Sequence, residues 1–566
     1  MSSRKDFKTR WFDLGIAIVL AAAVWLLYHP VLRLWWMYDD FYHFRHLITG
    51  RPWWYLFDGA EFRRLDSKVL TPLFFLSVDM DRRLFGLDPY AFYFHELLSV
   101  SLCAVAIHGA LRIWLRRLWA AVGAWVFLVG PVTGSLALLI FHRHYVEVII
   151  LGSLATMAWI GALRSTGKRA WMLTVLSAAF YFAATMAKEI AVPLIAILPL
   201  LPEPDGDRRT SLSERLRLIL PHVVMLALYL IIRYAVLGTL MGGYGFKVDF
   251  GSLPALALAL PGKIAAEFIG GRISVAAVFF LIAFVTGILA LFFLRGPWAL
   301  VLIGVALLLA LLPVLPVSTQ MEPRYAVPAW IVVAVAFAAG CQALAEKKQW
   351  IGVALGLIAC LSGLVLNRQD WNVRFARAER MSVEDRFLFG MTEGDVLRQP
   401  LLLTASLGEL QWMKENVFHR SRGGRWFQDD LYLCLHREPL GRVWGYDPGM
   451  RQVVDITARI PALTDQFCSS IRWDAPLRAS FHDSGGALYW DLGPYREGKY
   501  SFLMGDGAAV FEMPRSAAFQ MRERAPFLPL RVKYESLEGW VTYSPELRVS
   551  LVEGIRWGRG KGSNPG

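Results

Sequence analysis

Charged residues are scarce in this sequence of 566 residues. Asp, Glu, Lys and Arg together make up 19% of it, the hydrophobic types make up 56%, and the mean hydropathy is +0.42. Soluble domains carry about 25% charged residues. The composition therefore argues against a soluble enzyme of this size and indicates a membrane protein.

Cysteine is also rare, and the common catalytic signatures are missing. The five cysteines form no C-x-x-C pair: Cys103, Cys341 and Cys360 lie in apolar runs, and Cys434 and Cys468 lie in the polar tail. This spacing disfavours a metal cluster, and the two tail cysteines are candidates for one disulfide bond. The absence of G-x-x-x-x-G-K-[ST], H-E-x-x-H and G-x-S-x-G argues against ATPase, zincin and common hydrolase chemistry.

No Lys/Arg-rich block is present, although the net charge is +13. Without such a block the surplus does not indicate nucleic acid as a partner. Much of it lies in short loops between apolar runs, where the positive-inside rule places it if the N-terminus is cytoplasmic. The basic residues of these inner loops are Arg112, Arg116, Arg117, Arg164, Lys168, Arg169, Arg208, Arg209, Arg215, Arg217, Arg295, Lys347 and Lys348.

Eleven apolar runs are candidates to cross a bilayer, whose core of about 30 Å needs about 20 residues per helix. They are 13–36, 92–115, 119–140, 146–163, 170–187, 190–202, 219–238, 273–294, 297–317, 325–345 and 350–366. The first run follows basic residues but is too long for a signal peptide, so we expect it to be retained. The run 190–202 is short and rich in proline, and its neighbours require a return crossing.

Two polar segments interrupt the membrane domain, which we expect to comprise residues 1–366. Residues 37–91 form the first outer loop, whose aromatic residues favour helices lying along the headgroup region. Residues 239–272 contain an apolar stretch, Leu253 to Pro261, that is too short to span. We expect that stretch to be an interfacial or re-entrant piece.

The tail, residues 367–566, is polar and rich in glycine. Polar and apolar residues alternate over Leu528–Tyr534 and Trp540–Val549, which predicts β-strands. The expected fold is therefore a polytopic α-helical membrane protein of about 11 transmembrane helices with a C-terminal extracytoplasmic domain that is β-rich or α+β.

Four polar motifs lie on the outer side in this topology, and the first is Asp39-Asp40 at the outer end of the first run. A carboxylate there is a candidate general base, because an acceptor hydroxyl that attacks an anomeric carbon must lose its proton. Asp39 or Asp40 is also a candidate ligand for a divalent cation, Mg²⁺ or Mn²⁺, and no other cofactor is indicated. The alternative is structural, with a carboxylate capping the helix that follows.

The second motif is His142-Arg143-His144, which joins the third and fourth runs. Charged residues near membrane depth usually line a cavity, so this motif is a candidate contact for a lipid-linked phosphate. The alternative is an arginine that reaches towards the headgroups beside histidine and Tyr145 as interfacial anchors.

The third and fourth motifs are Lys188-Glu189 and Glu322-Pro323-Arg324-Tyr325. Lys188 is a candidate phosphate ligand with Glu189 as its orienting partner, or the two form only a local ion pair. Arg324 offers a fork of N–H donors close to a helix N-terminus, which favours anions.

Asp79-Met80-Asp81 matches the D-x-D pattern of nucleotide-sugar enzymes. Three residues are a weak signal, and no nucleotide-sugar pool is expected outside the membrane. We therefore interpret Asp79 and Asp81 as the polar face of a helix.

The order of these motifs resembles that of GT-C membrane glycosyltransferases, and most closely the protein O-mannosyltransferase-like and tetratricopeptide-containing O-mannosyltransferase group. The resemblance covers roughly residues 10–366 and depends on order and shared sidedness more than on any single motif. Its elements are Asp39-Asp40, Leu70-Thr71-Pro72-Leu73, Phe85-Gly86-Leu87-Asp88-Pro89, His95, His108, Arg143, Lys188-Glu189 and Arg324-Tyr325.

The resemblance implies a polyprenyl- or dolichyl-phosphate sugar donor, an acceptor at the outer face, and inverting transfer with Asp40 or Asp39 as base. Cations are enough to stabilise the leaving phosphate, which needs no proton. The candidate donor-phosphate residues are Arg324, Lys188, Arg143, His142 and Tyr325, supported by Glu189, Glu322 and His144.

Departures from the family leave the acceptor open. The tail has no helical repeat of about 34 residues, and Asp-Asp stands where protein mannosyltransferases usually carry Asp-Glu. The acceptor is a protein hydroxyl, an envelope glycan or a lipid-carrier intermediate, and the expected location is a bacterial inner membrane with a periplasmic tail in contact with membrane lipids.

Two other classes share some of these features. An O-antigen ligase or polymerase would use the same kind of donor but would depend on Arg and His more than on an Asp pair. A transporter or flippase would carry paired repeats with ionisable groups near the middle of the bilayer.

Overall fold

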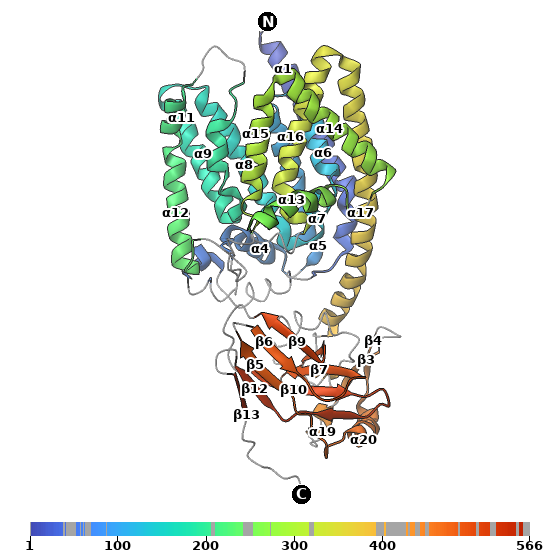
Figure 1. Cartoon of the computed structure of the whole chain (residues 1–566). Helices are drawn as coiled ribbons and strands as arrows, with labels where there is room; N and C mark the ends of the chain where they lie inside the picture. The colour runs from blue at the N-terminus through green and yellow to red at the C-terminus, as the bar shows by residue number, and fades with distance from the viewer. Residues whose placement is uncertain are drawn as a thin grey trace. The chain divides into compact units, whose positions relative to one another are not determined.

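The structure is a computed structural model of the chain, and it divides into two compact units, Met1–Val383 and Glu384–Gly566. The first unit is a bundle of helices, and the second contains the strands (Figure 1). The residues described are 2–37, 40, 52–56, 58–59, 62, 69–86, 88–204, 210–240, 253–271, 273–315, 322–391, 401–402, 426–427, 431–435, 442–447, 452–484, 487–504, 509–520, 528–550 and 554–557.

Eight helices in the described ranges are long and apolar enough to cross a membrane. They are α1 (Ser2–Tyr28), α5 (Pro89–Leu111), α8 (Arg143–Leu163), α9 (Gly167–Ala187), α12 (Leu220–Leu237), α14 (Val275–Arg295), α16 (Pro323–Lys347) and α17 (Gln349–Met391). The pair α6 (Arg117–Val129) and α7 (Pro131–Leu138) is a ninth candidate, bent by 62° at its junction. The chain is thus a polytopic α-helical membrane protein.

All eleven predicted apolar runs fall on helices. Eight coincide with the long helices, and the run 119–140 coincides with the bent pair. The other two are shorter: the run 297–317 gives α15 (Pro297–Leu311), and the run 190–202 gives an irregular helix, Glu189–Leu200. The latter divides into η4 (Glu189–Ala191), α10 (Leu194–Ile197) and η5 (Leu198–Leu200). Proline has no backbone N–H to donate, so a proline-rich run cannot keep a regular α-helix.

Local sequence explains several helix ends. At the start of α5, Asp88 accepts a hydrogen bond from the backbone N–H of Tyr90 at 3.0 Å, and Pro89 occupies the first turn, as at a typical N-terminus. α12 ends at Gly238, whose φ of 71° is left-handed and suits glycine. The bend between α6 and α7 falls at Pro131.

Small residues let α14 and α16 approach closely. A Cβ atom added to Gly340 on α16 would lie 2.0 Å from the carbonyl oxygen of Gly287 on α14. Trp330, also on α16, is fully buried and donates its indole N–H to the carbonyl oxygen of Phe127 on α6 at 3.2 Å. This packing fixes α16, whose first turn carries Arg324.

The two predicted non-spanning segments contain short helices. The first outer segment includes η2 (Pro52–Leu56) and α4 (Pro72–Phe85), and α4 lies at the end of the bundle opposite the N-terminus (Figure 1). The segment 239–272 contains α13 (Leu253–Phe268), with Pro261 inside it. α13 has 16 residues, fewer than the about 20 that a span needs, and it packs against α7 and α16, in agreement with a short interfacial or re-entrant piece.

The second unit contains β-strands, as the alternating sequence predicts, and its described strands form two antiparallel sheets and one mixed sheet. β10 (Leu528–Glu535) pairs with β7 (Lys499–Met504), β11 (Val541–Tyr543) and β12 (Leu547–Ser550). β8 (Ala509–Met513) and β13 (Gly554–Trp557) extend this sheet at its two edges. A second sheet has the order β5 (Ser480–Ser484), β6 (Ala487–Asp491), β9 (Ser516–Gln520), and a third joins β1 (Leu401–Leu402), β2 (Trp426–Phe427), β3 (Trp444–Asp447) and β4 (Gln452–Asp455).

The predicted disulfide is present. Cys434 in α19 (Leu431–Leu435) is bonded to Cys468 in α20 (Ile460–Ser470), with their Cα atoms 5.7 Å apart. The bond links two helices that also pack against each other.

The boundary between the units differs from the one expected after Leu366. That residue lies inside α17, which continues to Met391. The guanidinium of Arg374 binds Asp370 one turn earlier at 2.6 Å, an i,i+4 pair of the kind that supports a helix in polar surroundings. The change of composition therefore marks where the apolar part of α17 ends, and the division between the units follows Val383.

Candidate functional site

Asp40 is buried, with 1% of its surface exposed. Its Oδ1 accepts the backbone N–H of Phe141 at 3.0 Å, and its Oδ2 accepts the backbone N–H of Met37 at 3.2 Å. Two backbone N–H donors, one on each carboxylate oxygen, fix the orientation of this side chain. Asp39, the other candidate base, lies outside the described residues.

The segment opposite Asp40 is a tight turn that joins α7 to α8. Leu139 is extended, η3 (Ile140–His142) follows, and Arg143 begins α8. Its three consecutive residues serve three different partners: Phe141 donates to Asp40, His142 contacts Arg324, and Arg143 binds buried carboxylates. The turn therefore couples the candidate base to the candidate phosphate ligand.

His142 bridges the turn and α16. Its Nδ1 lies 2.7 Å from the carbonyl oxygen of Ser135, which can only accept, so Nδ1 carries the proton. Its Nε2 is then an acceptor for Nη1 of Arg324 at 2.9 Å. This tautomer orients one edge of the guanidinium.

Arg324 is 8% exposed and is held by several neighbours. Its guanidinium carbon lies 4.8 Å from the ring centre of Phe141 and 5.1 Å from that of Tyr325, and Nη2 lies 2.9 Å from a carboxylate oxygen of Glu322. Glu322 is about half exposed, so this ion pair is open to solvent on the carboxylate side.

Lys188 lies within electrostatic range of the Arg324 guanidinium. Its ammonium is buried, 5.6 Å from the ring centre of Tyr145 and 3.9 Å from a carboxylate oxygen of Glu189. The charges of Arg324 and Arg233 also act on it. The predicted local ion pair with Glu189 is thus present, but it is part of a larger cationic cluster, which we define as Lys188, Arg233 and Arg324.

Arg233 was not among the sequence candidates. It is buried on α12, where Nη1 donates to the hydroxyl of Tyr229 one turn earlier at 3.3 Å. An arginine inside an apolar run is itself a signal, because a charge at membrane depth is costly unless it faces a cavity or a partner. The basic residues predicted to contact the donor all lie at the ends of apolar runs, whereas Arg233 lies inside one.

The side chain of Arg143 contacts a separate set of buried groups. It is fully buried, with Nη1 on Asp81 at 2.5 Å, Nε on Glu96 at 3.0 Å and Nη2 on the carbonyl oxygen of Phe92 at 3.0 Å. Its donors are engaged by these groups. The structure therefore does not bring Arg143 to the cationic cluster, and we assign it a structural ion-pair network instead of a phosphate contact.

Tyr325 and His144 support the site through their rings. The hydroxyl of Tyr325 accepts from Nη2 of Arg324 at 3.4 Å. His144 is buried between the rings of Phe74, at 5.5 Å, and Tyr145, at 4.6 Å, and contributes packing.

Asp79 and Asp81 are both on α4, but they do not form a solvated polar face. Asp79 is buried and binds Arg82 at 2.8 Å and Arg83 at 2.6 Å, while Asp81 is buried against Arg143 and His95. Both residues lie on one helix, as interpreted from the sequence, but that polar face is buried against partners from the same helix and from α5 and α8. Across the described residues no group of three or more His, Cys, Asp or Glu side chains could hold a metal ion.

Comparison with known proteins gives structural neighbours only. No family model and no curated protein sequence matches the chain. Among solved structures, ArnT from Cupriavidus metallidurans bound to undecaprenyl phosphate is 15% identical, with 80% of this chain and 95% of that chain covered and a TM-score of 0.46. AglB from Archaeoglobus fulgidus, an archaeal oligosaccharyltransferase in complex with an inhibitory peptide and a dolichol-phosphate, is 11% identical, with 90% and 76% covered and a TM-score of 0.42.

A third neighbour is the arabinofuranosyltransferase AftD from Mycobacteria. It is 11% identical, with 88% of this chain and 41% of that chain covered and a TM-score of 0.44. At identities and TM-scores this low, we argue function from the chain's own residues.

Proposed function

We propose that this protein is an integral-membrane glycosyltransferase of the GT-C type that moves a sugar from a polyprenyl-phosphate-linked donor to a hydroxyl acceptor. The observation that carries the proposal is the turn at residues 139–142, which holds Asp40 through Phe141 and orients Arg324 through His142. A buried carboxylate and an oriented guanidinium joined by one turn suit a reaction with a proton to remove and a phosphate to release.

The chemical step uses the two groups in sequence. The acceptor O–H gives its proton to a carboxylate oxygen of Asp40, and the acceptor oxygen forms a bond to the anomeric carbon. The bond between that carbon and the phosphate oxygen breaks, and its electron pair leaves with the lipid phosphate. Attack from the face opposite the phosphate inverts the anomeric configuration.

The cationic cluster stabilises the leaving phosphate. Arg324 supplies a planar fork of donors, and Lys188 and Arg233 add charge. The rings of Phe141 and Tyr325 keep the guanidinium in place, so little reorganisation is needed when charge develops on the phosphate oxygen.

The disulfide of the second unit bears on the location of the protein and on its acceptor. The Cys434–Cys468 disulfide favours an oxidising compartment for the second unit, such as a bacterial periplasm next to the inner membrane. The acceptor is then a protein hydroxyl or an envelope glycan, and the protein O-mannosyltransferase-like group is the proposed subtype.

The test measures transfer of labelled sugar from a panel of polyprenyl-phosphate sugars in membranes that contain each variant. We expect wild type to consume one donor, and Asp40→Asn and Arg324→Ala to lose at least about 10²-fold in rate while still inserted and folded. The exposed Asp465→Asn and Arg169→Ala are matched controls and stay active. Full activity in Asp40→Asn, or consumption of no donor, contradicts the proposal.

An O-antigen ligase or polymerase is the second candidate, and the His142–Arg324 bond favours it because that class depends on Arg and His. It predicts an active Asp40→Asn variant together with an inactive Arg324→Ala variant. The same experiment therefore separates the two enzymes.

A further inference from the structure

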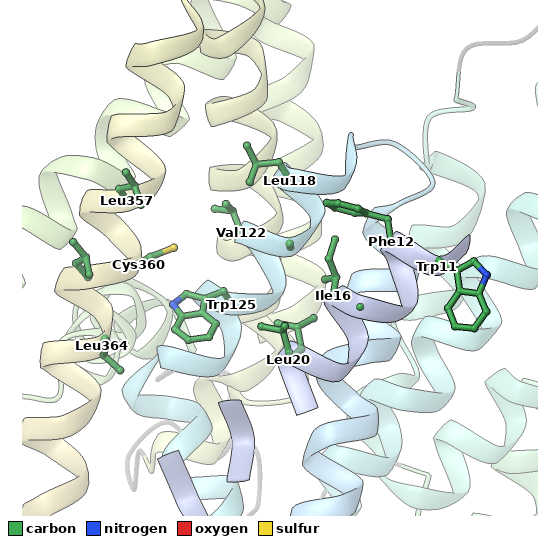
Figure 2. A pocket seen from close by; sticks show the side chains of 14 residues that line it. Trp11, Phe12, Ile16, Leu20, Leu118, Val122, Trp125, Leu357, Cys360 and Leu364 are labelled. Atoms are coloured by element: carbon green, nitrogen blue, oxygen red, sulfur yellow. The ribbon is translucent and has the colours of Figure 1, made fainter. Parts of the chain in front are cut away.

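An apolar groove of about 600 Å³ lies between α1, α6 and α17 (Figure 2). Phe12 and Ile16 line it from α1, Val122 from α6, and Leu357 and Leu364 from α17. No residue of the candidate functional site lines it. The groove is therefore separate from the proposed catalytic machinery.

The groove has the length of one leaflet. Along α1 it runs from Trp11 to Leu20, which is about 14 Å at 1.5 Å per residue. This is about half of a bilayer core of about 30 Å. Since Trp11 begins the first candidate span, the groove lies in the half of the membrane next to the chain's N-terminus.

The end of the groove near the N-terminus is positively charged. Arg117 at the start of α6 places its guanidinium carbon 5.7 Å from the ring centre of Phe12, which is part of the groove wall. Asp13 is shared between Arg117, at 3.3 Å, and Arg112, at 3.2 Å, and Arg116 is exposed beside them. One carboxylate is thus shared by two guanidinium groups, and the exposed Arg116 adds a third positive charge next to Arg117 in the chain.

The first turns of α1 add to this charge in sequence. Four basic residues and one acidic residue precede the span on this helix. They are Arg4, Lys5, Lys8, Arg10 and Asp6. Basic residues clustered at the end of a transmembrane helix attract anionic lipid headgroups, at about 1 kcal/mol per residue.

We propose that this groove is a binding site for an anionic phospholipid, with one acyl chain between α1, α6 and α17 and the headgroup phosphate on Arg116 and Arg117. The apolar walls fit the chain, the length fits one leaflet, and the charge is complementary only at the end where a headgroup lies. A neutral phospholipid has no net charge to match these arginines and is expected to bind more weakly.

Gly15 offers a direct way to fill the groove. A Cβ atom added there meets no other atom within 4 Å, and Gly15 is one of the residues that line the groove. Gly15→Phe is therefore the variant chosen to fill the groove, because its Cβ atom has open space around it. Gly304 on α15 is equally open and does not line the groove, so Gly304→Phe is the matched control for an added ring on a helix.

The headgroup contact is tested separately. Arg116→Gln/Arg117→Gln removes two charges at the mouth of the groove. Lys168→Gln/Arg169→Gln removes two exposed charges at the start of α9, which does not line the groove. Arg116→Gln alone removes an exposed charge and leaves the Asp13 pairs intact.

The experiment uses purified, delipidated full-length protein in detergent, titrated with dioleoylphosphatidylglycerol, dioleoylphosphatidylcholine or a polyprenyl phosphate. Unfolding temperature and the number of lipids retained in native mass spectrometry are measured. We expect the anionic lipid to raise the unfolding temperature of wild type more than the neutral one. Gly15→Phe and the Arg116/Arg117 variant should lose at least half of that difference, and both controls should keep it.

Three results overturn the proposal. Equal stabilisation by the two lipids removes the headgroup contact, and a Gly15→Phe variant that responds like wild type removes the acyl-chain position. Stabilisation by a polyprenyl phosphate but not by phosphatidylglycerol identifies a different occupant. If Gly15→Phe fails to fold, Arg116→Gln decides, because an unchanged response of that exposed-site variant contradicts the headgroup position.

Discussion

The backbone N–H of Phe141 donates a hydrogen bond to Oδ1 of Asp40 across 101 residues of sequence. A backbone donor cannot be removed by a side-chain mutation, so the position of the carboxylate depends on the path of the turn. Two neighbouring residues fix that path. His142 contacts Arg324, and Arg143 forms ion pairs with Asp81 and Glu96. The position of the candidate base thus also depends on His142 and Arg143, which hold the turn that carries its Phe141 donor.

His142 is expected to act as a positioning residue for Arg324. His142→Leu removes the acceptor at 2.9 Å, and hydrogen bonds to charged groups contribute about 1.5–3 kcal/mol. We predict that KM for the sugar donor rises about 10- to 100-fold while kcat at saturating donor falls less. Steady-state kinetics with the identified donor measure both constants.

His142→Gln is the conservative variant, because its side-chain oxygen can also accept from Arg324. We expect it to recover part of the donor affinity. A kcat loss as large as the KM change in both variants would show that His142 does more than orient the guanidinium.

Arg143 is expected to stabilise the fold rather than bind donor. Arg143→Met leaves Asp81 and Glu96 buried without their counter-charge, which costs about 3–5 kcal/mol. Thermal unfolding in detergent measures the loss. Combining Arg143→Met with Glu96→Gln should recover part of it, because one buried charge is removed.

Arg83→Met is the control for removing an arginine from a pair with a carboxylate. Its side chain is about half exposed beside Asp79, so the expected cost is at most about 1 kcal/mol. If Arg143→Met is no more destabilising than Arg83→Met, the buried network is not what holds the turn.

The sequence predicts the helices well because each apolar run is a local property. Every predicted run is helical, and the short stretch at Leu253–Pro261 is part of α13. The end of α17 is not predictable in this way, because the helix continues past its apolar part. The composition of a segment indicates whether it lies in an apolar environment. The length of the helix also depends on local pairs such as Asp370–Arg374.

The candidate site is harder to predict, because the direction in which each residue of a turn points depends on the tertiary structure. Successive residues of a helix differ by about 100°, so Phe141, His142 and Arg143 reach three different partners although they are adjacent. The partners of Arg143 lie 62 and 47 residues away, and no spacing rule links them. Asp40, Lys188 and Arg324 are found because they lie at the ends of apolar runs, whereas Arg233 inside a run is missed.

Glu203 provides a pH-dependent contribution to stability outside the spans. Burial acts to raise its pKa, but the hydrogen bonds from Thr210 and Arg215 outweigh burial and hold the pKa of Glu203 below the ordinary value. A depressed folded pKa contributes stability above the unfolded value of about 4.3, and the contribution is lost as the pH falls through the folded pKa. We predict that Glu203→Gln unfolds at a lower temperature than wild type at pH 7 and that the difference shrinks below about pH 4.

The exposed Glu497→Gln is the control and should match wild type at both pH values. A difference between wild type and Glu203→Gln that is the same at pH 7 and below pH 4 would mean that Glu203 acts without its charge.

The Cys434–Cys468 bond should dominate the stability of the second unit. The two cysteines are 34 residues apart in sequence, and closing a loop of this length is expected to add about 3–4 kcal/mol to the free energy of unfolding in the chain-entropy account. We predict that Cys434→Ser/Cys468→Ser makes residues 384–566 open to limited proteolysis in the full-length protein while the helical unit stays resistant, and that dithiothreitol reproduces this in wild type. Cys360→Ser, which removes a free thiol on α17, should leave the digestion pattern unchanged. If dithiothreitol leaves the wild-type pattern unchanged although both sulfurs become reactive to a thiol label, the bond is not needed for that unit, and its support for an oxidising compartment is lost.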